Sequence, residues 1–350
     1  MEIRAATQKL EQHEDLTRAE ARSVLERLLS GNVPDPEIMA LVVALRDKGE
    51  QVEELVGFAE VMRERAREGL RAAGVDVEAL RRRGPLLDTC GTGGDEKGTF
   101  NVSTATALVA AAAGVRVAKH GNRSISSRCG SADVMEALGV KIDIPLERIP
   151  ECLEKVGMVF LFAPRLHLAM KHVMNARRAL QTKTVFNLLG PLTNPLGASV
   201  QLVGVYDRAR TAMMATALAA LGAQRAIVVA GHDGLDEITL SGPTQVSELS
   251  GGRVTTREIE PEDFGLLRVP GESLKGGDAE TNARLLREVL SGARGPFRDV
   301  VVANTSAALA VAGKAGDFPE GVALARQAID SGAGLGTLNE LIRFTQQAAH

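Results

Sequence analysis

The segment Asp88-Thr-Cys-Gly-Thr-Gly-Gly-Asp95 is the strongest chemical signal in the sequence. Three glycines within four positions allow a sharp turn in which successive backbone N–H groups point inward, and such a turn binds anions. A helix predicted to begin near Ser103 would direct its positive end at the same anion. The segment lacks the closing Gly-Lys-Ser/Thr of a Walker A loop, and its spacing is not Gly-x-Gly-x-x-Gly. Taken alone, it is as consistent with a plain glycine-rich turn as with phosphate binding.

A second polar segment, from Lys119 to Ser127, concentrates two cations, a histidine, an amide and three hydroxyls in nine residues. Phosphate and sugar groups are recognised by such hydrogen-bond donors. A solvated loop is the alternative interpretation. It is less well supported, because apolar elements predicted at Val115–Ala118 and Ala132–Leu138 enclose the segment.

A pair of adjacent acidic residues, Asp236 and Glu237, follows the predicted strand Ala226–Ala230. Mg²⁺ takes one or two protein carboxylates together with phosphate oxygens of a substrate. Surface turns often contain such pairs, so the pair alone is a weak signal. Together with the two anion-binding segments it predicts a metal ion that bridges protein and phosphate. Asp95 would suit the same kind of ion or a ribose hydroxyl.

A fourth segment begins at His167. A helix predicted from about Leu168 would carry Lys171 and Arg178 one heptad apart, with Arg177 on the adjacent face. Arginines on exposed helices usually face solvent, and single histidines are usually structural. This segment alone therefore indicates no site.

Hydrophobic spacing predicts the elements that position these segments. The first 70 residues contain helical patterns only, with a capping box at Thr17 and Glu20 and a helix end at Lys48-Gly49. After Gly84, short apolar runs alternate with helical stretches, which predicts an α/β domain with a mostly parallel sheet. The predicted strands are Leu86-Leu87, Val115–Ala118, Val159–Phe162, Leu202–Val205 and Ala226–Ala230, and Leu240–Val254 reads as antiparallel. The polar segments follow strands directly, where open α/β sheets bind ligands.

Length and composition narrow the function further. The chain has 350 residues, which suggests two domains. Its 41 Lys+Arg against 44 Asp+Glu give a formal charge of −3, which argues against bulk binding of nucleic acid or anionic membranes. Trp is absent and Tyr occurs once, so stacking platforms for single strands are missing. The three cysteines lack metal-binding spacing, and no segment resembles a secretion signal or a membrane span. We expect a cytoplasmic protein.

The four segments occur together and in this order in one known family. From about residue 10 to about residue 345, the sequence resembles the anthranilate phosphoribosyltransferases. The shared motifs are DTCGTGGD from Asp88, NVST from Asn101, KHGNRSISS from Lys119, GSAD from Gly130, the helix from His167, FNLLGPLTNP from Phe186, and DGLDE from Asp233.

The resemblance implies the fold of the nucleoside phosphorylase and phosphoribosyltransferase class. A small all-helical domain, residues 1–70 completed by helices at about 168–186, would accompany a large α/β domain with a mostly parallel central sheet. The large domain, the remainder of 71–350, would bind 5-phosphoribosyl-1-diphosphate (PRPP). The helical domain would also form the contact of a homodimer.

The reaction implied by the resemblance transfers the 5-phosphoribosyl group of PRPP to the amino group of anthranilate. Pyrophosphate is released, and the step is the second from chorismate to L-tryptophan. The implied PRPP-binding residues are Gly91, Gly94, Asp95, Thr99, Asn101, Val102, Ser103, Thr104, Lys119, His120, Gly121, Asn122, Arg123, Ser124, Ile125, Ser126, Ser127 and Ser131. The implied anthranilate-binding residues are Gly91, Asn122 and Arg177, with His120 and His167 near the entry path. Ser103, Asp236 and Glu237 would bind two Mg²⁺ ions.

No general base is assigned, because the anthranilate amine is already a nucleophile near neutral pH and positioning suffices. The sequence departs from the family at Leu168, where proline is usual, and at Gln181-Thr-Lys-Thr184, where Gly-Ile-Arg-Thr is common. Two alternatives stay open: a pyrimidine nucleoside phosphorylase, and a non-catalytic nucleic-acid-binding relative on the same scaffold.

Overall fold

A central sheet organises the chain, of which the computed structural model describes residues 1–95, 97–124 and 128–348. Within these residues seven strands pair in the order β3-β2-β1-β4-β5-β6-β7. The strands are β1 (Leu87–Asp88), β2 (Val117–Gly121), β3 (Met158–Phe162), β4 (Val200–Gly204), β5 (Arg225–Gly231), β6 (Thr244–Ser250) and β7 (Arg253–Ile259). The first five run parallel, and β6 and β7 add an antiparallel edge. The predicted mostly parallel α/β fold is confirmed.

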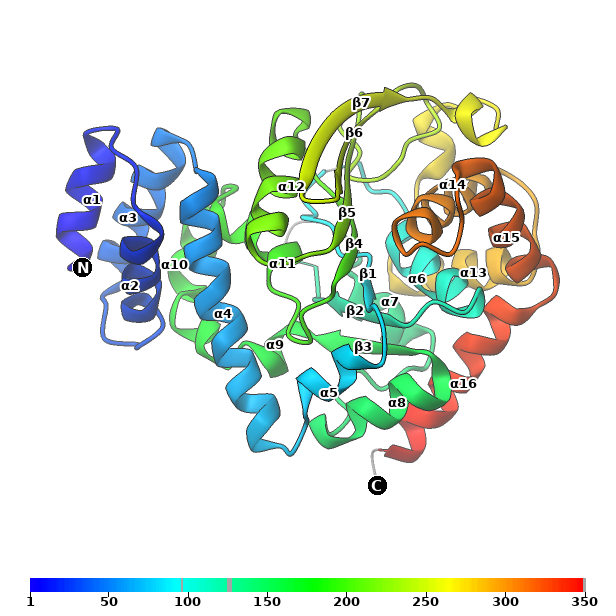
Figure 1. The fold of residues 1–350 in the computed structure, drawn as a ribbon, viewed down its shortest axis with the longest axis horizontal. Helices are drawn as coiled ribbons and strands as arrows, with labels where there is room; N and C mark the ends of the chain where they lie inside the picture. The colour runs from blue at the N-terminus through cyan, green and yellow to red at the C-terminus, as the bar shows by residue number, and fades with distance from the viewer. Residues whose placement is uncertain (96, 125–127, 349–350) are drawn as a thin grey trace.

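Helices cover both faces of this sheet (Figure 1). In the α/β part they are α5 (Val77–Arg82), α6 (Val102–Ala112), α7 (Ser131–Ala137), α8 (Ile149–Val156), α9 (Ala163–Leu166), α11 (Val185–Leu192), α12 (Thr211–Ala220), α13 (Ala279–Leu290), α14 (Pro296–Val311), α15 (Phe318–Asp330) and α16 (Ala333–Ala348). Successive strand residues point to opposite faces. Leu202 and Ile227 therefore join the core that includes α6 and α14, whereas Val203 and Val228 join the core that includes α11 and α12.

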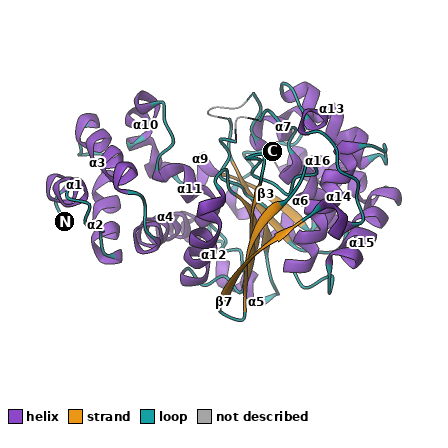
Figure 2. Cartoon of the chain, turned by 90° about the horizontal axis from the view of Figure 1, so that it is seen from above, coloured by secondary structure: helices purple, strands orange, loops and turns teal. Residues whose placement is uncertain are grey.

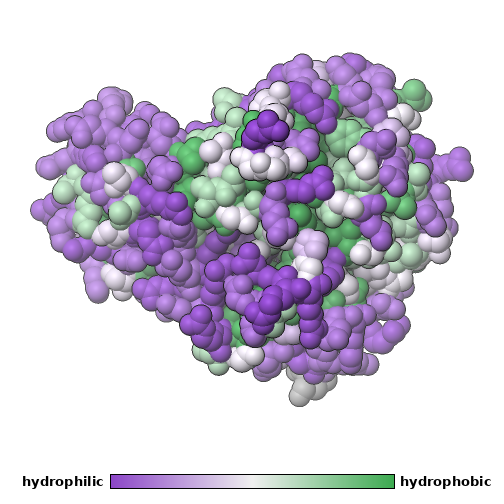
Figure 3. Space-filling model, viewed as in Figure 1, coloured by the Kyte–Doolittle hydropathy of each residue, from purple (hydrophilic) through white to green (hydrophobic). Residues whose placement is uncertain are grey.

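The N-terminal helices form a separate group at one end of the molecule (Figure 2). They are α1 (Ile3–Glu11), α2 (Arg18–Leu28), α3 (Asp35–Lys48) and α4 (Val52–Ala72), so the prediction of helices in this region is confirmed. The predicted capping box is present, because the Glu20 N–H donates to Thr17 Oγ1 at 3.2 Å and the Thr17 N–H donates to the Glu20 carboxylate at 2.8 Å. On the face shown in Figure 3, hydrophilic residues predominate over these helices. No helix among the described residues is long and apolar enough to cross a membrane.

The segment after β3 differs from the single helix predicted from about Leu168, and that prediction is wrong. A short 3₁₀ turn, η2 (Leu168–His172), is followed by a separate helix, α10 (Met174–Leu180). Between them lies Val173, with φ −109° and ψ −4°, which buries its side chain in the core of the N-terminal helices. His172 lies against the turn between α2 and α3, where a Cβ on Gly31 would come within 2.6 Å of the imidazole Nδ1. The segment therefore packs on the N-terminal helices.

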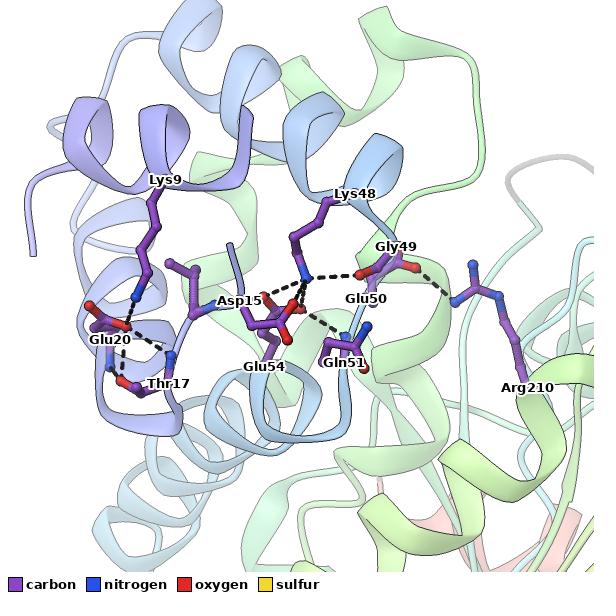
Figure 4. A network of polar contacts seen from close by, with 11 residues as sticks. Lys9, Asp15, Thr17, Glu20, Lys48, Gly49, Glu50, Gln51, Glu54 and Arg210 are labelled. Atoms are coloured by element: carbon purple, nitrogen blue, oxygen red, sulfur yellow. Dashed lines mark hydrogen bonds and ion pairs between the residues drawn. The ribbon is translucent and has the colours of Figure 1, made fainter. Parts of the chain in front are cut away.

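A polar network connects these helices to the α/β part (Figure 4). The Lys48 ammonium is almost completely buried and lies 3.0 Å from Glu54 and 2.7 Å from Asp15. Glu50, at the start of α4, accepts a hydrogen bond of 2.7 Å from Arg210, which directly precedes α12. Removing one member of a buried ion pair is strongly destabilising. The network therefore fixes the start of α4 relative to α12.

Gln181 ends α10 in the left-handed conformation, with φ 47° and ψ 32°. This conformation costs an L-residue about 1–2 kcal/mol and a glycine almost nothing, whereas glycine loses about 0.5–1 kcal/mol more entropy on folding. Gln181→Gly is therefore expected to raise the free energy of unfolding by about 0.5–1 kcal/mol, measured by denaturant unfolding. His13→Gly is a matched comparison, because His13 has φ 59°. A loss of stability in Gln181→Gly would show that side-chain contacts of Gln181 dominate.

Candidate functional site

The segments singled out by the sequence converge on one cavity of about 290 Å³ at the carboxyl ends of the parallel strands. The loop after β1, the segment after β2, the start of α6 and the loop after β5 all line it. The predicted residues that line the cavity are Gly91, Gly94, Asp95, Thr99, Asn101, Val102, Ser103, Lys119, His120, Gly121, Asn122, Arg123, Ser124, Ser131, Arg177, Asp236 and Glu237. Segments distant in sequence thus share one space.

Two predicted residues among those that the structure describes are not part of this lining. Thr104 is completely buried within α6, and His167 is buried beside His120. Ile125, Ser126 and Ser127 lie outside the described residues.

The glycine-rich loop has the backbone conformation that its sequence predicts. Gly93 and Gly94 have φ of 63° and 76°, in the region that favours glycine. The Thr92 N–H donates to the Gly204 carbonyl at 2.8 Å, which ties the loop to the end of β4. The Gly93 N–H donates to Asp236 Oδ2 at 2.8 Å. The anion-binding loop and the acidic pair therefore touch directly.

Three carboxylates, those of Asp95, Asp236 and Glu237, converge on this part of the cavity. Burial raises the pKa of each carboxyl group, and repulsion between these groups raises the pKa values of Asp236 and Glu237 further. Like charges this close require a cation to be ionised together. With the Ser103 hydroxyl, the site offers the hard oxygen ligands that Mg²⁺ prefers, so the residues present fit the predicted ion.

Lys119 lies beneath the cavity floor with 1% of its surface exposed. Its ammonium donates to the Thr89 carbonyl at 3.3 Å, to Thr89 Oγ1 at 3.3 Å and to Ser103 Oγ at 3.2 Å. None of these acceptors is charged. Its charge also acts on the nearby carboxylates of Asp88 and Glu237, so Lys119 contributes positive charge to the floor of the cavity.

Asp88 and Asn194 hold the ends of β1 and β2 together, a connection that the sequence did not reveal. The Asp88 carboxylate accepts from the His120 N–H at 3.1 Å and from Asn194 Nδ2 at 2.8 Å. Asn194 also donates to the Ala118 carbonyl at 2.8 Å. Complete burial raises the pKa of Asp88 to about 6. These bonds fix the backbone that carries Lys119.

Helices α10 and α11 contribute another part of the lining. Arg177 of α10 faces Phe186 of α11, with the guanidinium carbon 5.9 Å from the ring centroid. Burial lowers the pKa of Arg177, and no carboxylate lies in salt-bridge range among the described residues. A planar aromatic acid would find a guanidinium for its carboxylate and a phenyl wall for its ring here.

Gly93, part of the predicted anion-binding turn, also lines the cavity, and the sequence did not assign individual roles to a further set of lining residues: Cys90, Thr92, Gly98, Phe100, Cys129, Gly130, Ala163, Phe186, Asn187, Gly190 and Leu235. Most are neighbours of predicted residues. Phe186, Asn187 and Gly190 belong to the FNLLGPLTNP motif. The sequence indicated that this motif belongs to the binding site, but not that the first turns of α11 line the cavity.

His120 and His167 form a buried pair, with ring centroids 5.2 Å apart and planes at 69°. His120 Nδ1 lies 3.2 Å from the Gly190 carbonyl, and neither Nε2 atom has a hydrogen-bond partner among the residues that the structure describes. Burial lowers the pKa of His120 to about 4 and that of His167 to about 3. Both rings are therefore neutral near pH 7.

This pair predicts a pH effect on stability. In the unfolded chain histidine takes up a proton near its ordinary pKa of about 6.5, whereas in the folded chain burial lowers the pKa of His167 to about 3. As the pH falls from about 6.5 toward about 3, the unfolded state binds a proton that the folded state does not, so the free energy of unfolding decreases. His167→Leu removes this contribution. Between about pH 7 and about pH 5, wild type is expected to lose about 2 kcal/mol relative to the variant in denaturant unfolding. His13→Asn, at an exposed histidine, should leave the pH dependence unchanged.

Comparisons with known proteins cover nearly the whole chain. A family model described as glycosyl transferase family, a/b domain, matches residues 83–335, and one described as the helical bundle domain of that family matches residues 4–66. The anthranilate phosphoribosyltransferase of Rubrobacter xylanophilus is 51% identical over 348 residues, which are 99% of this chain and 98% of that protein. The Geobacter sulfurreducens protein of the same name is 47% identical over 349 residues, 99% and 100% of the two chains.

Solved structures agree with these relatives. The crystal structure of anthranilate phosphoribosyltransferase from Thermus thermophilus has a TM-score of 0.87 at 44% identity and covers 97% of this chain and 99% of that chain. The Saccharomyces cerevisiae enzyme in complex with PRPP and Mg has a TM-score of 0.85 at 27% identity and covers 99% and 98%.

Proposed function

The chain belongs to the anthranilate phosphoribosyltransferase family, and from this premise we propose that its cavity holds PRPP at the glycine loop and anthranilate beside Arg177. The enzyme transfers the 5-phosphoribosyl group of PRPP to the amino group of anthranilate and releases pyrophosphate. The observation that supports the site assignment is the shared cavity, which is lined both by anion-binding groups and by the Arg177–Phe186 pair.

The chemistry requires separation of charge. The ribose C1–O bond breaks, the C1–N bond forms, the amine loses a proton, and the electron pair of the broken bond leaves with pyrophosphate. Positive charge develops on the ribose and negative charge on the diphosphate, so electrostatic stabilisation is the main demand. Lys119 and the backbone N–H groups of the loop Gly91–Asp95 other than those of Thr92 and Gly93, which donate to Gly204 and Asp236, would meet this demand.

We further propose that Asp236, Glu237 and the Ser103 hydroxyl hold Mg²⁺, with two ions as the expected number. A bound Mg²⁺ supplies charge neutralisation for the diphosphate. The structure of the yeast relative with PRPP and Mg supports this assignment. No residue is proposed as a general base, because the family's amine nucleophile needs only to be held against C1.

The small domain is proposed to comprise residues 1–70 and about 168–186, and to form a homodimer contact in a cytoplasmic enzyme. The common apolar core of the N-terminal helices with Val173 and Ala176 supports this division. Light scattering of the purified protein tests the dimer.

A fluorescence assay of anthranilate consumption, with and without PRPP and Mg²⁺, tests the function. Consumption that needs both additions is expected, and none under any condition would refute the assignment. Similarity over nearly the full length decides against the nucleoside phosphorylase and nucleic-acid-binding alternatives.

Arg177→Ala is expected to raise the KM for anthranilate about ten- to a hundredfold and to change the KM for PRPP little. Loss of a charge-assisted hydrogen bond to the substrate carboxylate costs about 1.5–3 kcal/mol. Arg178→Ala is the matched control, because Arg178 is the exposed neighbour on the same helix. Equal effects on both substrates would mean that Arg177 acts through the fold.

A further inference from the structure

Lys183 lies beside the glycine loop without being part of the cavity lining. It belongs to the four-residue connection 181–184 between α10 and α11. Its Cε is 3.4 Å from the position that a Cβ on Gly94 would occupy. The ammonium, one bond further along, is therefore within reach of any group bound at the loop.

The Lys183 ammonium rests on the face of Tyr206, with Nζ 4.0 Å from the ring centroid. Tyr206 follows the end of β4, and the last residue of that strand, Gly204, accepts the hydrogen bond from Thr92 in the glycine loop. The ring is thus at the same sheet edge as the loop. Among the described residues no hydrogen bond or salt bridge holds the ammonium. A cation–π contact at a partly exposed site is weak compared with an ion pair to phosphate.

Two of the other cations around the loop, Arg123 and Lys119, already have hydrogen-bond partners. Arg123 donates to Glu136 at 2.9 Å and to Asp133 at 3.2 Å. Lys119 is fixed beneath the floor by the bonds described above, and Lys97 lies over Gly234 of the acidic loop. Among the described residues, the Lys183 ammonium thus lies beside the loop, and its single partner is the aromatic ring of Tyr206.

We propose that Lys183 is a further binding residue for the diphosphate of PRPP, held on Tyr206 in the free enzyme and transferred to the diphosphate when it binds at the glycine loop. This proposal rests on the proposed function, because it requires PRPP at this loop. Tyr206 acts as a positioning residue, since its ring holds the ammonium close to the loop.

The chain offers a direct spectroscopic test, because Tyr206 is its single tyrosine and tryptophan is absent. Titration of the free enzyme with magnesium pyrophosphate is expected to change tyrosine emission as the ammonium leaves the ring. In Lys183→Met the change should be lost, and the affinity for pyrophosphate and the KM for PRPP should weaken about ten- to a hundredfold. The KM for anthranilate should stay within about twofold. Lys183→Arg should restore most of the affinity.

Lys171→Met is the matched control, because Lys171 is an exposed lysine of η2, on the other side of α10, without a salt bridge in the described structure. Wild-type affinity for pyrophosphate in a folded Lys183→Met would overturn the proposal and leave the proposed function intact. Failure of the wild-type enzyme to bind pyrophosphate or PRPP would instead overturn the proposed function. Equal losses for both substrates in Lys183→Met would also overturn the proposal, because they would indicate a structural role.

Discussion

Replacement of Asp236 by Asn together with Glu237 by Gln is expected to reduce kcat/KM by at least about a thousandfold. Both carboxylates line the part of the cavity where the glycine loop lies, and Asp236 accepts a hydrogen bond from that loop. PRPP carries several negative charges, so without ionised ligands for Mg²⁺ the diphosphate loses its neutralising charge. Steady-state rates at increasing Mg²⁺ measure the effect, and added metal is not expected to rescue the variant.

The same double variant is expected to be more stable than wild type. Burial and mutual repulsion raise the pKa values of both carboxyl groups in the folded state, so ionising them costs folding free energy. At about pH 8 the neutral amides should increase the free energy of unfolding by about 1–2 kcal/mol. This range already allows for the partial exposure of both carboxyl groups to water in the cavity. Below about pH 7 this gain should shrink, because the wild-type carboxylates take up protons as the pH falls.

Asp233→Asn is the control for the double variant, because it removes a carboxylate from the same loop without removing a proposed metal ligand. Asp233 belongs to the same loop but bonds to the Thr239 hydroxyl at 2.8 Å and the Ser241 hydroxyl at 2.6 Å, and it does not line the cavity. Its variant should retain metal-dependent activity. Full activity of the double variant in a chelator would contradict the assignment of Asp236 and Glu237, whereas equal loss in Asp233→Asn would indicate that the loop fold matters more than the charges.

The sequence predicted the parts of the molecule that depend on short-range patterns. Apolar runs such as Leu202–Val205 identified strands to within two residues of β4, and the capping box at Thr17 identified the start of α2. The site followed from the same patterns, because polar segments that come directly after parallel strands meet at one edge of the sheet. Local chemistry and strand order together explain why four separate segments share a cavity.

Features that depend on contacts between distant segments could not be predicted in this way. The bond from Asn194 to Asp88 joins residues 106 positions apart, and it exists because β1 lies between β2 and β4. The break at Val173 likewise reflects burial against the N-terminal helices, a tertiary contact that overrides helical spacing. The position of Lys183 beside the glycine loop could not be predicted from the sequence, because it depends on the left-handed backbone conformation of Gln181.

Gly93→Val is expected to reduce the affinity for PRPP by at least about a hundredfold while the protein remains folded. Gly93 has φ 63° and no atom within 4 Å of the position of an added Cβ, so a side chain meets backbone strain but no clash. A β-branched residue resists this conformation. The loop is therefore expected to relieve the strain by rotating the peptide that carries the Gly93 N–H, which now points at Asp236. The anion-binding turn is lost in that rotation.

Gly265→Val is the control for this variant, because Gly265 has the same φ of 63°, has no atom within 4 Å of an added Cβ, and does not line the cavity. The strain at a left-handed residue costs about 1–2 kcal/mol, so both variants should lose similar stability in a thermal melt. Only Gly93→Val should lose PRPP in calorimetric titration with Mg²⁺. If both variants bound PRPP equally well, the loop would be an ordinary turn, and the diphosphate would have to be held by Lys119 and the metal ligands alone.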